Sequence, residues 1–300
     1  MCDETDPPKS EQANALWRTR AENHISRRQF GAMGAAATLA ACAGVDPGSA
    51  PYGSLKEDSV TITTPDGTMD AFFVRPDTKL SGGGHPAVIC WPDIAGLRDA
   101  FKLMARRTAA DGFAVLVINP YYRDLPAPQF TEFADFLNGG WDKVDPWRAK
   151  LDAQAIMRDA LAVTAWLDDQ GGVDAGRAIG TEGYCMGGPF TIWSAAALPD
   201  RLRAAASFHG AWLVGDDPDS PNNLLAASRA SHLIAIAQND DAKDPDARLR
   251  LKAAADAGGR SAEIEVYAAD HGWCVLDSLA YNKEEAERAY SRKMALYAGL

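Results

Sequence analysis

Short apolar runs alternate along this chain with longer stretches in which apolar residues recur every three or four positions. Residues 177–181 and 231–237 form strand-like apolar runs, and residues 262–267 alternate between apolar and polar positions as a strand does. Residues 151–167 and 283–297 instead show the apolar spacing of helices. Strands that alternate with helices predict an α/β fold, with a mostly parallel central sheet flanked by helices in a single domain.

The first 42 residues follow a different pattern. Arg27 and Arg28 precede an alanine-rich apolar stretch, residues 31–41, that is too short to span a membrane as a permanent helix. Twin arginines before such a stretch are typical of a twin-arginine export signal, and a basic, alanine-rich tail is the alternative. The sequence therefore predicts an exported protein that is periplasmic or anchored by lipid to the cell envelope.

Cys42 ends a Leu-Ala-Ala-Cys segment that resembles a bacterial lipoprotein cleavage box. Cleavage there would leave Cys42 as a lipidated N-terminus, whereas the small residues around it also suit an ordinary signal peptidase, so both alternatives stand. Residues 43–57 are rich in Gly, Pro, Ser and Asp and predict a flexible linker. Residues 58–300 predict the folded domain.

Composition narrows the classes of partner. The chain has 300 residues, of which 47% are hydrophobic, and this is ample for a sizeable core. Its formal net charge of −11 argues against nucleic-acid binding, which needs a basic surface, and gives no reason to expect affinity for anionic membranes. We therefore expect a small-molecule partner, with contact to a membrane only through a lipid at Cys42.

Three cysteines, Cys90, Cys185 and Cys274, fall in the predicted domain. Their number is odd and Cys90 lies in a strand expected to be buried, so the sequence predicts no disulfide framework. Their spacing matches no metal site, and we expect neither a metal nor a cofactor.

Residues 183–188, which read Gly-Tyr-Cys-Met-Gly-Gly, form the most informative motif. They lie between a predicted strand and a helix predicted at 189–198, which is the context of a nucleophile elbow. Cys185 stands where such elbows usually carry serine, flanking glycines relieve clashes in the strained turn, and a helix N-terminus favours the thiolate. The alternative is a small buried cysteine on an ordinary strand-to-helix turn.

Later segments supply the groups that such a nucleophile needs. In hydrolases with this elbow, an acid and then a histidine follow on loops after later strands. Asp240 and Asp241 follow one predicted strand, and His271 follows the next. We predict Cys185 as the nucleophile and His271 as its base, oriented by Asp240 or Asp241. His209 ends another strand, and we expect it to have a structural or supporting role.

Four segments together resemble the dienelactone hydrolase family of α/β-hydrolases. Residues 91–98 look like the family's loop after strand 3, residues 109–123 look like its helix–strand unit that ends in an arginine, and the elbow is similar to the family's own. Residues 237–240 resemble its acid-bearing turn, which favours Asp240 as the acid. The resemblance covers most of the chain from about residue 60 onward. It implies a hydrolase of carboxylic esters or lactones, similar to a carboxymethylenebutenolidase, that works through an acyl-enzyme intermediate.

The resemblance also implies roles around Cys185. The oxyanion hole would consist of the backbone N–H groups of Ile94 and Met186. Asp93 matches a family position whose acidic side chain modulates the resting thiol, although it is one methylene shorter than the family's glutamate. The alternative for Asp93 is an N-cap for a helical segment that begins near Leu97.

Substrate binding is implied in the same way. Family members that act on dienelactone hold the substrate carboxylate with two arginines. Arg123, next to Tyr122, matches the first, but Trp273 follows His271 where the second cation is expected. The implied substrate-binding residues are therefore Arg123, Tyr122 and Trp273, and the lost cation predicts a preference for neutral or bulkier esters over small anionic lactones. A loop-anchoring role is the alternative for Arg123.

Residues 124–148 concentrate aromatic side chains amid prolines and acids. They predict either a short helical cap that lines an apolar pocket at the mouth of the site or a locally packed excursion. Two alternatives to catalysis also stand for the whole protein. One is a binding protein that keeps the elbow, and the other is a thiol redox sensor in which Cys274 resolves an oxidised Cys185.

Overall fold

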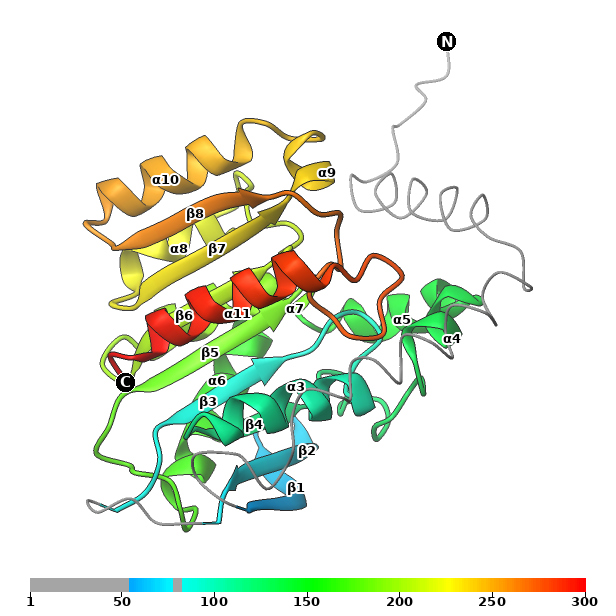
Figure 1. The fold of residues 1–300 in the computed structure, drawn as a ribbon, viewed down its shortest axis with the longest axis vertical. Helices are drawn as coiled ribbons and strands as arrows, with labels where there is room; N and C mark the ends of the chain where they lie inside the picture. Colours follow the sequence, from blue (N-terminus) through cyan, green and yellow to red (C-terminus); the bar gives the residue numbers. More distant parts are fainter. Residues whose placement is uncertain (1–53, 78–82) are drawn as a thin grey trace. The chain divides into compact units, whose positions relative to one another are not determined.

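The computed structural model describes residues 54–77 and 83–300, which belong to one unit, Ala50–Leu300 (Figure 1). The predicted export signal, the cleavage box at Cys42 and residues 43–53 of the predicted linker lie outside the described residues. Strand β1 begins at Leu55, three residues before the predicted start of the domain, and Leu55 pairs with Pro76 on the adjacent strand.

The described residues form one eight-stranded sheet with the order β1-β2-β4-β3-β5-β6-β7-β8. The strands β1 and β2 pair antiparallel, β2 also pairs antiparallel with β4, and all other neighbours are parallel. The mostly parallel sheet predicted from the sequence is therefore confirmed. The strands are β1 Leu55–Thr64, β2 Gly67–Pro76, β3 Ala87–Trp91, β4 Ala114–Ile118, β5 Ile179–Tyr184, β6 Leu202–Phe208, β7 Ser231–Ala237 and β8 Ala262–Tyr267.

Helices connect these strands. They are α3 Asp99–Ala110, α4 Phe133–Leu137, α5 Gly140–Arg148, α6 Ala153–Asp168, α7 Gly187–Ala197, α8 Pro221–Leu224, α9 Gln238–Asp241, α10 Ala247–Ala257 and α11 Lys283–Tyr297, with a 3₁₀ turn η2 Leu225–Ala227. The final helix has the predicted bounds. Helix α6 begins two residues later than predicted, because Asp152 is its N-cap and accepts a hydrogen bond from the backbone N–H of Ala155.

Helices cover both faces of the sheet, as Figure 1 shows. Strand β4 illustrates how the sequence divides the core, because alternate residues of a strand point to opposite faces. Leu116 and Ile118 pack in the cluster that contains α6 and α7, whereas Val115 and Val117 pack in the cluster that contains α3 and α11. Two hydrophobic layers therefore enclose a sheet whose central strands are buried on both sides.

A buried ion pair joins α11 to the centre of the sheet. Lys293 Nζ lies 2.7 Å from Glu182 Oε2, and the two side chains are 2% and 0% exposed. Lys293 also donates to the hydroxyl of Thr108 on α3, at 2.9 Å. A buried charge pair of this kind is strongly destabilised when one partner is removed, so it fixes α11 and α3 against β5.

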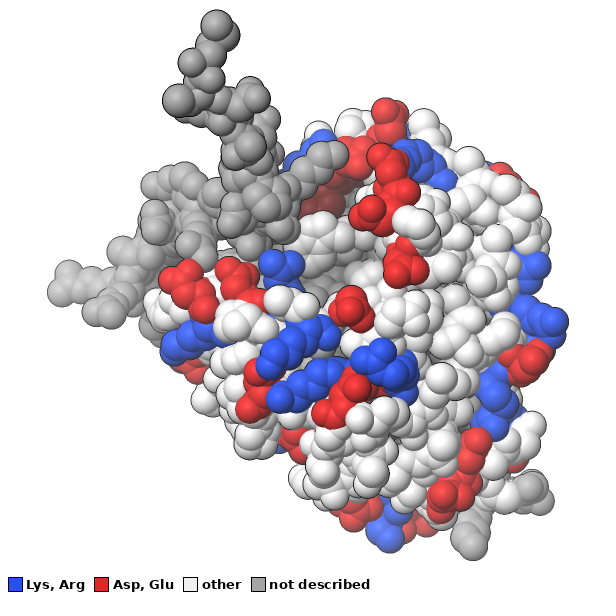
Figure 2. Space-filling model, turned by 180° about the vertical axis from the view of Figure 1, so that it is seen from behind, with Lys and Arg blue, Asp and Glu red and all other residues white. Residues whose placement is uncertain are grey.

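The described surface carries charges of both signs. Figure 2 shows basic and acidic side chains interspersed on the face seen from behind. Among the described residues, no helix has the length and apolar character that crossing a membrane requires.

Candidate active site

Cys185 occupies a sharp turn between β5 and α7, in a left-handed backbone conformation with φ of 53°. A Cβ on Gly183 would lie 2.0 Å from the carbonyl oxygen of Gly187, and a Cβ on Gly187 would lie 2.3 Å from that of Trp91. Side chains at either position would collide with backbone, so the turn requires glycine. The predicted strand–turn–helix context of Cys185 is confirmed.

Backbone hydrogen bonds hold Cys185 in this strained conformation. Its N–H donates to the carbonyl of Phe208 at 3.1 Å, and its own carbonyl accepts from Ala211 at 3.0 Å and from Gly188 at 3.0 Å. The loop after β6 is therefore attached directly to the elbow. The Cys185 side chain is neither fully buried nor fully exposed, so a small molecule can approach its sulfur.

The structure places Asp240 and His271 together. His271 Nδ1 lies 2.5 Å from Asp240 Oδ2, and the backbone N–H of His271 donates to Asn239 Oδ1 at 2.9 Å. Helix α9 and the loop after β8 bring these residues together because β7 and β8 are parallel and end at the same edge of the sheet. Asp241 instead lies 3.2 Å from Arg248, so Asp240 is the carboxylate that orients the imidazole.

Charges around His271 favour its protonated form. Burial alone would lower its pKa, but attraction from Cys185, a hydrogen bond to Asp240 and a hydrogen bond to Cys185 together raise the pKa to about 10. Burial raises the pKa of Asp240, yet its hydrogen bond to His271 and the nearby positive charge bring that pKa below its ordinary value. The arrangement therefore favours an imidazolium between Cys185 and Asp240.

The ring of His209 packs against the ring of His271. Its side chain is 1% exposed, its ring centroid lies 4.7 Å from that of His271, and its backbone φ is 40°. Neither ring nitrogen has a hydrogen-bond partner among the residues described. Burial and the adjacent charge of His271 lower the pKa of His209 well below its ordinary value. His209 is therefore a neutral packing surface for the His271 ring.

Trp273 does not offer the aromatic surface to substrate that the family resemblance implied. Its side chain is fully buried, stacks on Tyr267 with ring centroids 5.1 Å apart, and meets His209 edge-on at 5.2 Å. It lies behind the histidines because the backbone reverses immediately after His271, where Gly272 has φ of 97°. Trp273 therefore holds the loop that carries His271.

The predicted oxyanion donors lie on the elbow and on the loop after β3, and their role stays a prediction. Met186 precedes the first turn of α7, and Ile94 lies in the loop after β3. Tyr121, which sequence reasoning missed, fixes this region because its hydroxyl donates to the carbonyl of Ile94 at 2.7 Å and lies 3.4 Å from Met186 Sδ. Among the described residues, the backbone N–H groups of Ile94 and Met186 donate to no backbone carbonyl, as donors to an anionic oxygen would require.

Asp93 forms a salt bridge that neither sequence interpretation anticipated. Its two carboxylate oxygens accept from Arg98 at 2.7 and 2.9 Å, and one also accepts from the N–H of Ala95 at 2.9 Å. Arg98 and Ala95 are thus the hydrogen-bond partners of the Asp93 carboxylate among the described residues, and its expected role toward the thiol stays a prediction. Nor does Asp93 cap a helix, because α3 begins at Asp99 with Arg98 as its N-cap.

Arg98 links three segments around the site. Besides Asp93, its guanidinium binds both oxygens of Asp277 at 2.7 and 2.8 Å, and its side chain is 0% exposed. Asp277 follows His271 in sequence and also accepts from the N–H of Phe133 at 2.9 Å. Although burial lowers the pKa of Arg98, the two carboxylates raise it above its ordinary value, so the residue stays charged. A charged residue directly after an apolar loop was the signal for Arg98 in the sequence.

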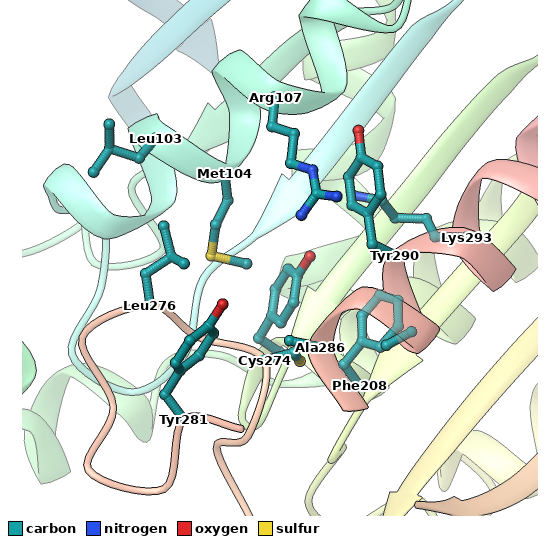
Figure 3. Close-up of a pocket in the computed structure, with 12 residues that line it drawn as sticks. Leu103, Met104, Arg107, Phe208, Cys274, Leu276, Tyr281, Ala286, Tyr290 and Lys293 are labelled. Carbon is teal, nitrogen blue, oxygen red and sulfur yellow. The ribbon is translucent and has the colours of Figure 1, made fainter. Parts of the chain in front are cut away.

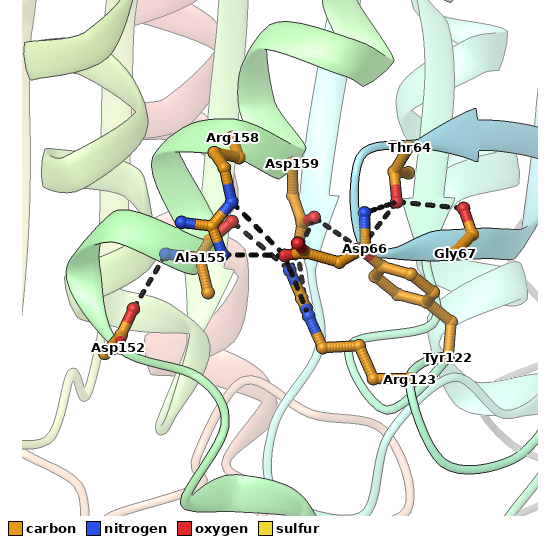
Figure 4. A network of polar contacts seen from close by, with 9 residues as sticks. All are labelled: Thr64, Asp66, Gly67, Tyr122, Arg123, Asp152, Ala155, Arg158 and Asp159. Atoms are coloured by element: carbon orange, nitrogen blue, oxygen red, sulfur yellow. Dashed lines mark hydrogen bonds and ion pairs between the residues drawn. The ribbon is translucent and has the colours of Figure 1, made fainter.

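Arg123 and Tyr122 belong to a separate polar network (Figure 4). The Arg123 guanidinium binds Asp159 at 2.8 and 2.9 Å and Asp66 at 2.7 Å, while the Tyr122 hydroxyl donates to Asp159 at 2.7 Å. These contacts join the β1–β2 turn to α6. A substrate carboxylate would have to displace one of these aspartates, so the geometry supports the loop-anchoring alternative for Arg123 and corrects the expectation of substrate binding for both residues.

The aromatic segment 124–148 folds into α4 and α5 and is packed on itself. Phe136 contacts Phe130, Phe133 and Trp141 with ring centroids 4.9 to 5.6 Å apart. At its end, however, the guanidinium of Arg148 lies 5.0 Å from the ring centroid of Trp212, beside the elbow. The segment is therefore a locally packed excursion, and a cap whose aromatic side chains line the mouth of the site stays a prediction.

Cys274 lies on the other side of the histidine loop. It lines a small cavity of about 80 Å³ between α3 and α11, together with Met104 and Tyr281 (Figure 3). Burial raises the pKa of the Cys274 thiol well above its ordinary value, which makes it a poor nucleophile toward an oxidised sulfur. Cys185 and Cys274 are both free thiols, and nothing in this geometry favours a redox pair. In the described part of the chain, no group of three or more His, Cys, Asp or Glu side chains is placed to hold a metal ion.

The sequence of this chain is similar to a known family and to several named proteins. The sequence model of the dienelactone hydrolase family matches residues 69–299. A Salmonella typhi protein named "Putative carboxymethylenebutenolidase" is 27% identical over 253 residues, which cover 83% of this chain and 89% of that protein. An Escherichia coli K12 protein of the same name is 28% identical over 231 residues, covering 75% and 80% of the two chains.

Solved structures share the fold. The crystal structure described as "Putative Dienelactone Hydrolase" from Klebsiella pneumoniae superposes with a TM-score of 0.71 at 24% identity, covering 82% of this chain and 100% of that one. A dienelactone hydrolase from Anabaena variabilis gives a TM-score of 0.57 at 15% identity and covers 82% and 99%. The predicted α/β-hydrolase fold is therefore confirmed, as is the resemblance carried by the four sequence segments.

The buried position of Arg98 predicts a large effect on stability. Arg98→Met leaves two carboxylates without their cation, and we expect the free energy of unfolding to fall by about 3–5 kcal/mol. Arg106→Met is the matched control on the same helix, because its ion pair with Glu57 is about one-third exposed and should cost less than about 1 kcal/mol. Denaturant unfolding of the two variants measures the difference, and equal losses would contradict the role assigned to Arg98.

The charges around His271 predict an unusual titration. We expect the His271 imidazole to keep its proton until about pH 10, compared with 6.5 for an ordinary histidine, and to titrate at lower pH in Cys185→Ala. NMR of the imidazole ring signals, assigned with His271→Gln, measures both midpoints. A wild-type midpoint near 6.5, or one that Cys185→Ala leaves unchanged, would show that His271 does not interact with Cys185 as described.

Proposed function

Because this chain belongs to the dienelactone hydrolase family, we propose that it hydrolyses carboxylic esters or lactones with Cys185 as nucleophile, His271 as general acid and base, and Asp240 as the residue that orients His271. One observation carries the proposal: a histidine that is hydrogen-bonded to a carboxylate has its pKa raised by a cysteine that lies on a strained, glycine-flanked turn. Nucleophile, base and orienting group in that relation are the arrangement that covalent hydrolysis needs.

The proposed first half-reaction forms an acyl-enzyme. The Cys185 thiolate attacks the carbonyl carbon, and the carbonyl oxygen becomes an anion that accepts hydrogen bonds from the N–H groups of Ile94 and Met186. The bond between carbon and the leaving oxygen then breaks, and the His271 imidazolium gives its proton to that oxygen. An alcohol leaves, or the ring opens in a lactone, while Cys185 holds the acyl group as a thioester.

The second half-reaction returns the enzyme to its starting state. Neutral His271 takes a proton from a water molecule, whose oxygen attacks the thioester carbon. The carbon–sulfur bond breaks, the carboxylic acid leaves, and Cys185 and His271 are again thiolate and imidazolium. Asp240 keeps Nδ1 of His271 protonated throughout, so Nε2 is the atom that carries the transferred proton.

Substitution of the nucleophile tests the proposal. We expect Cys185→Ala to lower kcat/KM for aryl esters at least about a thousandfold without unfolding the protein, because no acyl-enzyme can form. Cys185→Ser should retain little activity, since a hydroxyl needs stronger base assistance than a thiol. Hydrolysis by Cys185→Ala at the wild-type rate, with circular dichroism showing the native fold, would refute the assignment.

We also propose that residues 1–42, which lie outside the described residues, direct export of the folded protein by the twin-arginine route. The pair Arg27 and Arg28 before an alanine-rich stretch supports this proposal. Replacing both arginines with lysine should trap the precursor in the cytoplasm, as measured by cell fractionation. A full-length, uncleaved wild-type chain that is soluble in the cytoplasm of its host would count against export.

A further inference from the structure

A cavity of about 340 Å³ adjoins the elbow and has no role in the chemistry described above. It is bounded by Met186, Phe190 and Trp193 from the elbow and α7, by Trp212 from the loop after β6, and by Arg148 from α5. Its volume is that of a small-molecule site, and Met186 places it next to Cys185. We propose, on the basis of the function proposed above, that this cavity binds a neutral, planar, oxygen-bearing aromatic group of the ester or lactone substrate.

Trp212 provides the first argument for an aromatic occupant. Its side chain is 44% exposed and its backbone has φ of 53°, a conformation that a bulky residue rarely adopts. The neighbouring Ala211 is hydrogen-bonded to the carbonyl of Cys185, which holds this strained loop against the elbow. Strain of this kind persists where the surrounding structure maintains it, and here it keeps a large aromatic face exposed beside the nucleophile.

Arg148 provides the second argument, because it can recognise an oxygen atom. Its Nε is buried and has no hydrogen-bond partner within the described chain, while its NH2 group lies 3.5 Å from Asp145. The guanidinium is also held over the Trp212 ring at 5.0 Å. The Arg148 side chain is 20% exposed and lines the cavity, so a hydroxyl, ether or carbonyl oxygen on a ring stacked against Trp212 could accept from the accessible N–H groups of its guanidinium.

The charges around the cavity exclude the anionic alternative. Asp152, Asp217 and Asp219 line the same cavity, so three carboxylates stand against the single guanidinium of Arg148. A carboxylate-bearing substrate would be repelled by these groups, whereas a neutral group avoids that repulsion. Trp193 further stabilises this wall because its indole N–H donates to the carbonyl of Asp219 at 2.8 Å.

The test compares matched esters. Methyl 4-methoxyphenylacetate carries the neutral ring on its acyl side, and 4-methoxyphenyl acetate carries it on its alcohol side. The corresponding 4-carboxy compounds are their anionic partners. We expect wild type to hydrolyse at least one methoxy ester with kcat/KM about tenfold or more above its carboxy partner. Trp212→Ala should abolish this preference, and Arg148→Met should weaken it. Leu249→Ala, an exposed apolar residue on α10, is the control and should change nothing.

A binding measurement separates this inference from the hydrolase itself. In Cys185→Ala, calorimetric titration with the preferred methoxy ester should give an affinity about tenfold higher than in Cys185→Ala combined with Trp212→Ala. Equal affinities, or an unchanged preference in Trp212→Ala, would overturn the inference while leaving ester hydrolysis by Cys185 intact. If the wild-type protein hydrolyses none of these esters, but Cys185→Ala still binds the methoxy ester in a way that depends on Trp212, the catalytic proposal alone is refuted.

The double variant Asp217→Asn and Asp219→Asn tests the charge selection. It should raise kcat/KM for the carboxy esters, and a decrease in kcat/KM would contradict the role assigned to these two carboxylates.

Discussion

The buried salt bridges of Arg98 are the interaction on which the geometry of the site depends. One guanidinium binds Asp93, in the loop that carries Ile94, and Asp277, in the loop that follows His271. Asp277 in turn accepts from the backbone of the aromatic segment. Because a buried charge without partners is costly, these segments can hardly move apart while the protein is folded. The loop that carries Ile94, the proposed oxyanion donor, and the loop that carries His271, the proposed base, are thereby linked to each other.

The elbow adds a second constraint that acts on the reacting sulfur. At Gly183 and Gly187 the backbone passes so close to neighbouring backbone that a side chain would collide with it. The last residue of β6 accepts a hydrogen bond from the N–H of Cys185, and the loop after β6 donates one to its carbonyl. His271 is confined between Asp240 and the ring of His209. Catalysis of this kind requires groups that are positioned before the substrate arrives, and these contacts position them without help from the substrate.

Local pattern and strand order made the centre of the site predictable from the sequence. The elbow, Asp240 and His271 could be found because each comes directly after a recognisable strand, and parallel strands end at one edge of the sheet. The partners of Arg98 and Arg123 could not be found, because they lie on segments far apart in the sequence, at Asp277 and Asp159. Side-chain direction in irregular loops was equally hidden. Trp273 turns into the core, and Tyr121 rather than its neighbour contacts the oxyanion region.

The most direct test of the catalytic proposal is to trap the acyl-enzyme. The protein is mixed with an excess of the 4-nitrophenyl ester of a slowly released acid, and the reaction is quenched with acid within the first turnover. The intact mass then shows whether a covalent adduct has formed, and peptide mapping locates it. We expect one added acyl group, carried by the peptide that contains Cys185 and lost as turnover completes. Ester turnover with Cys185 unmodified throughout, or an adduct that forms on another residue, would contradict the proposal.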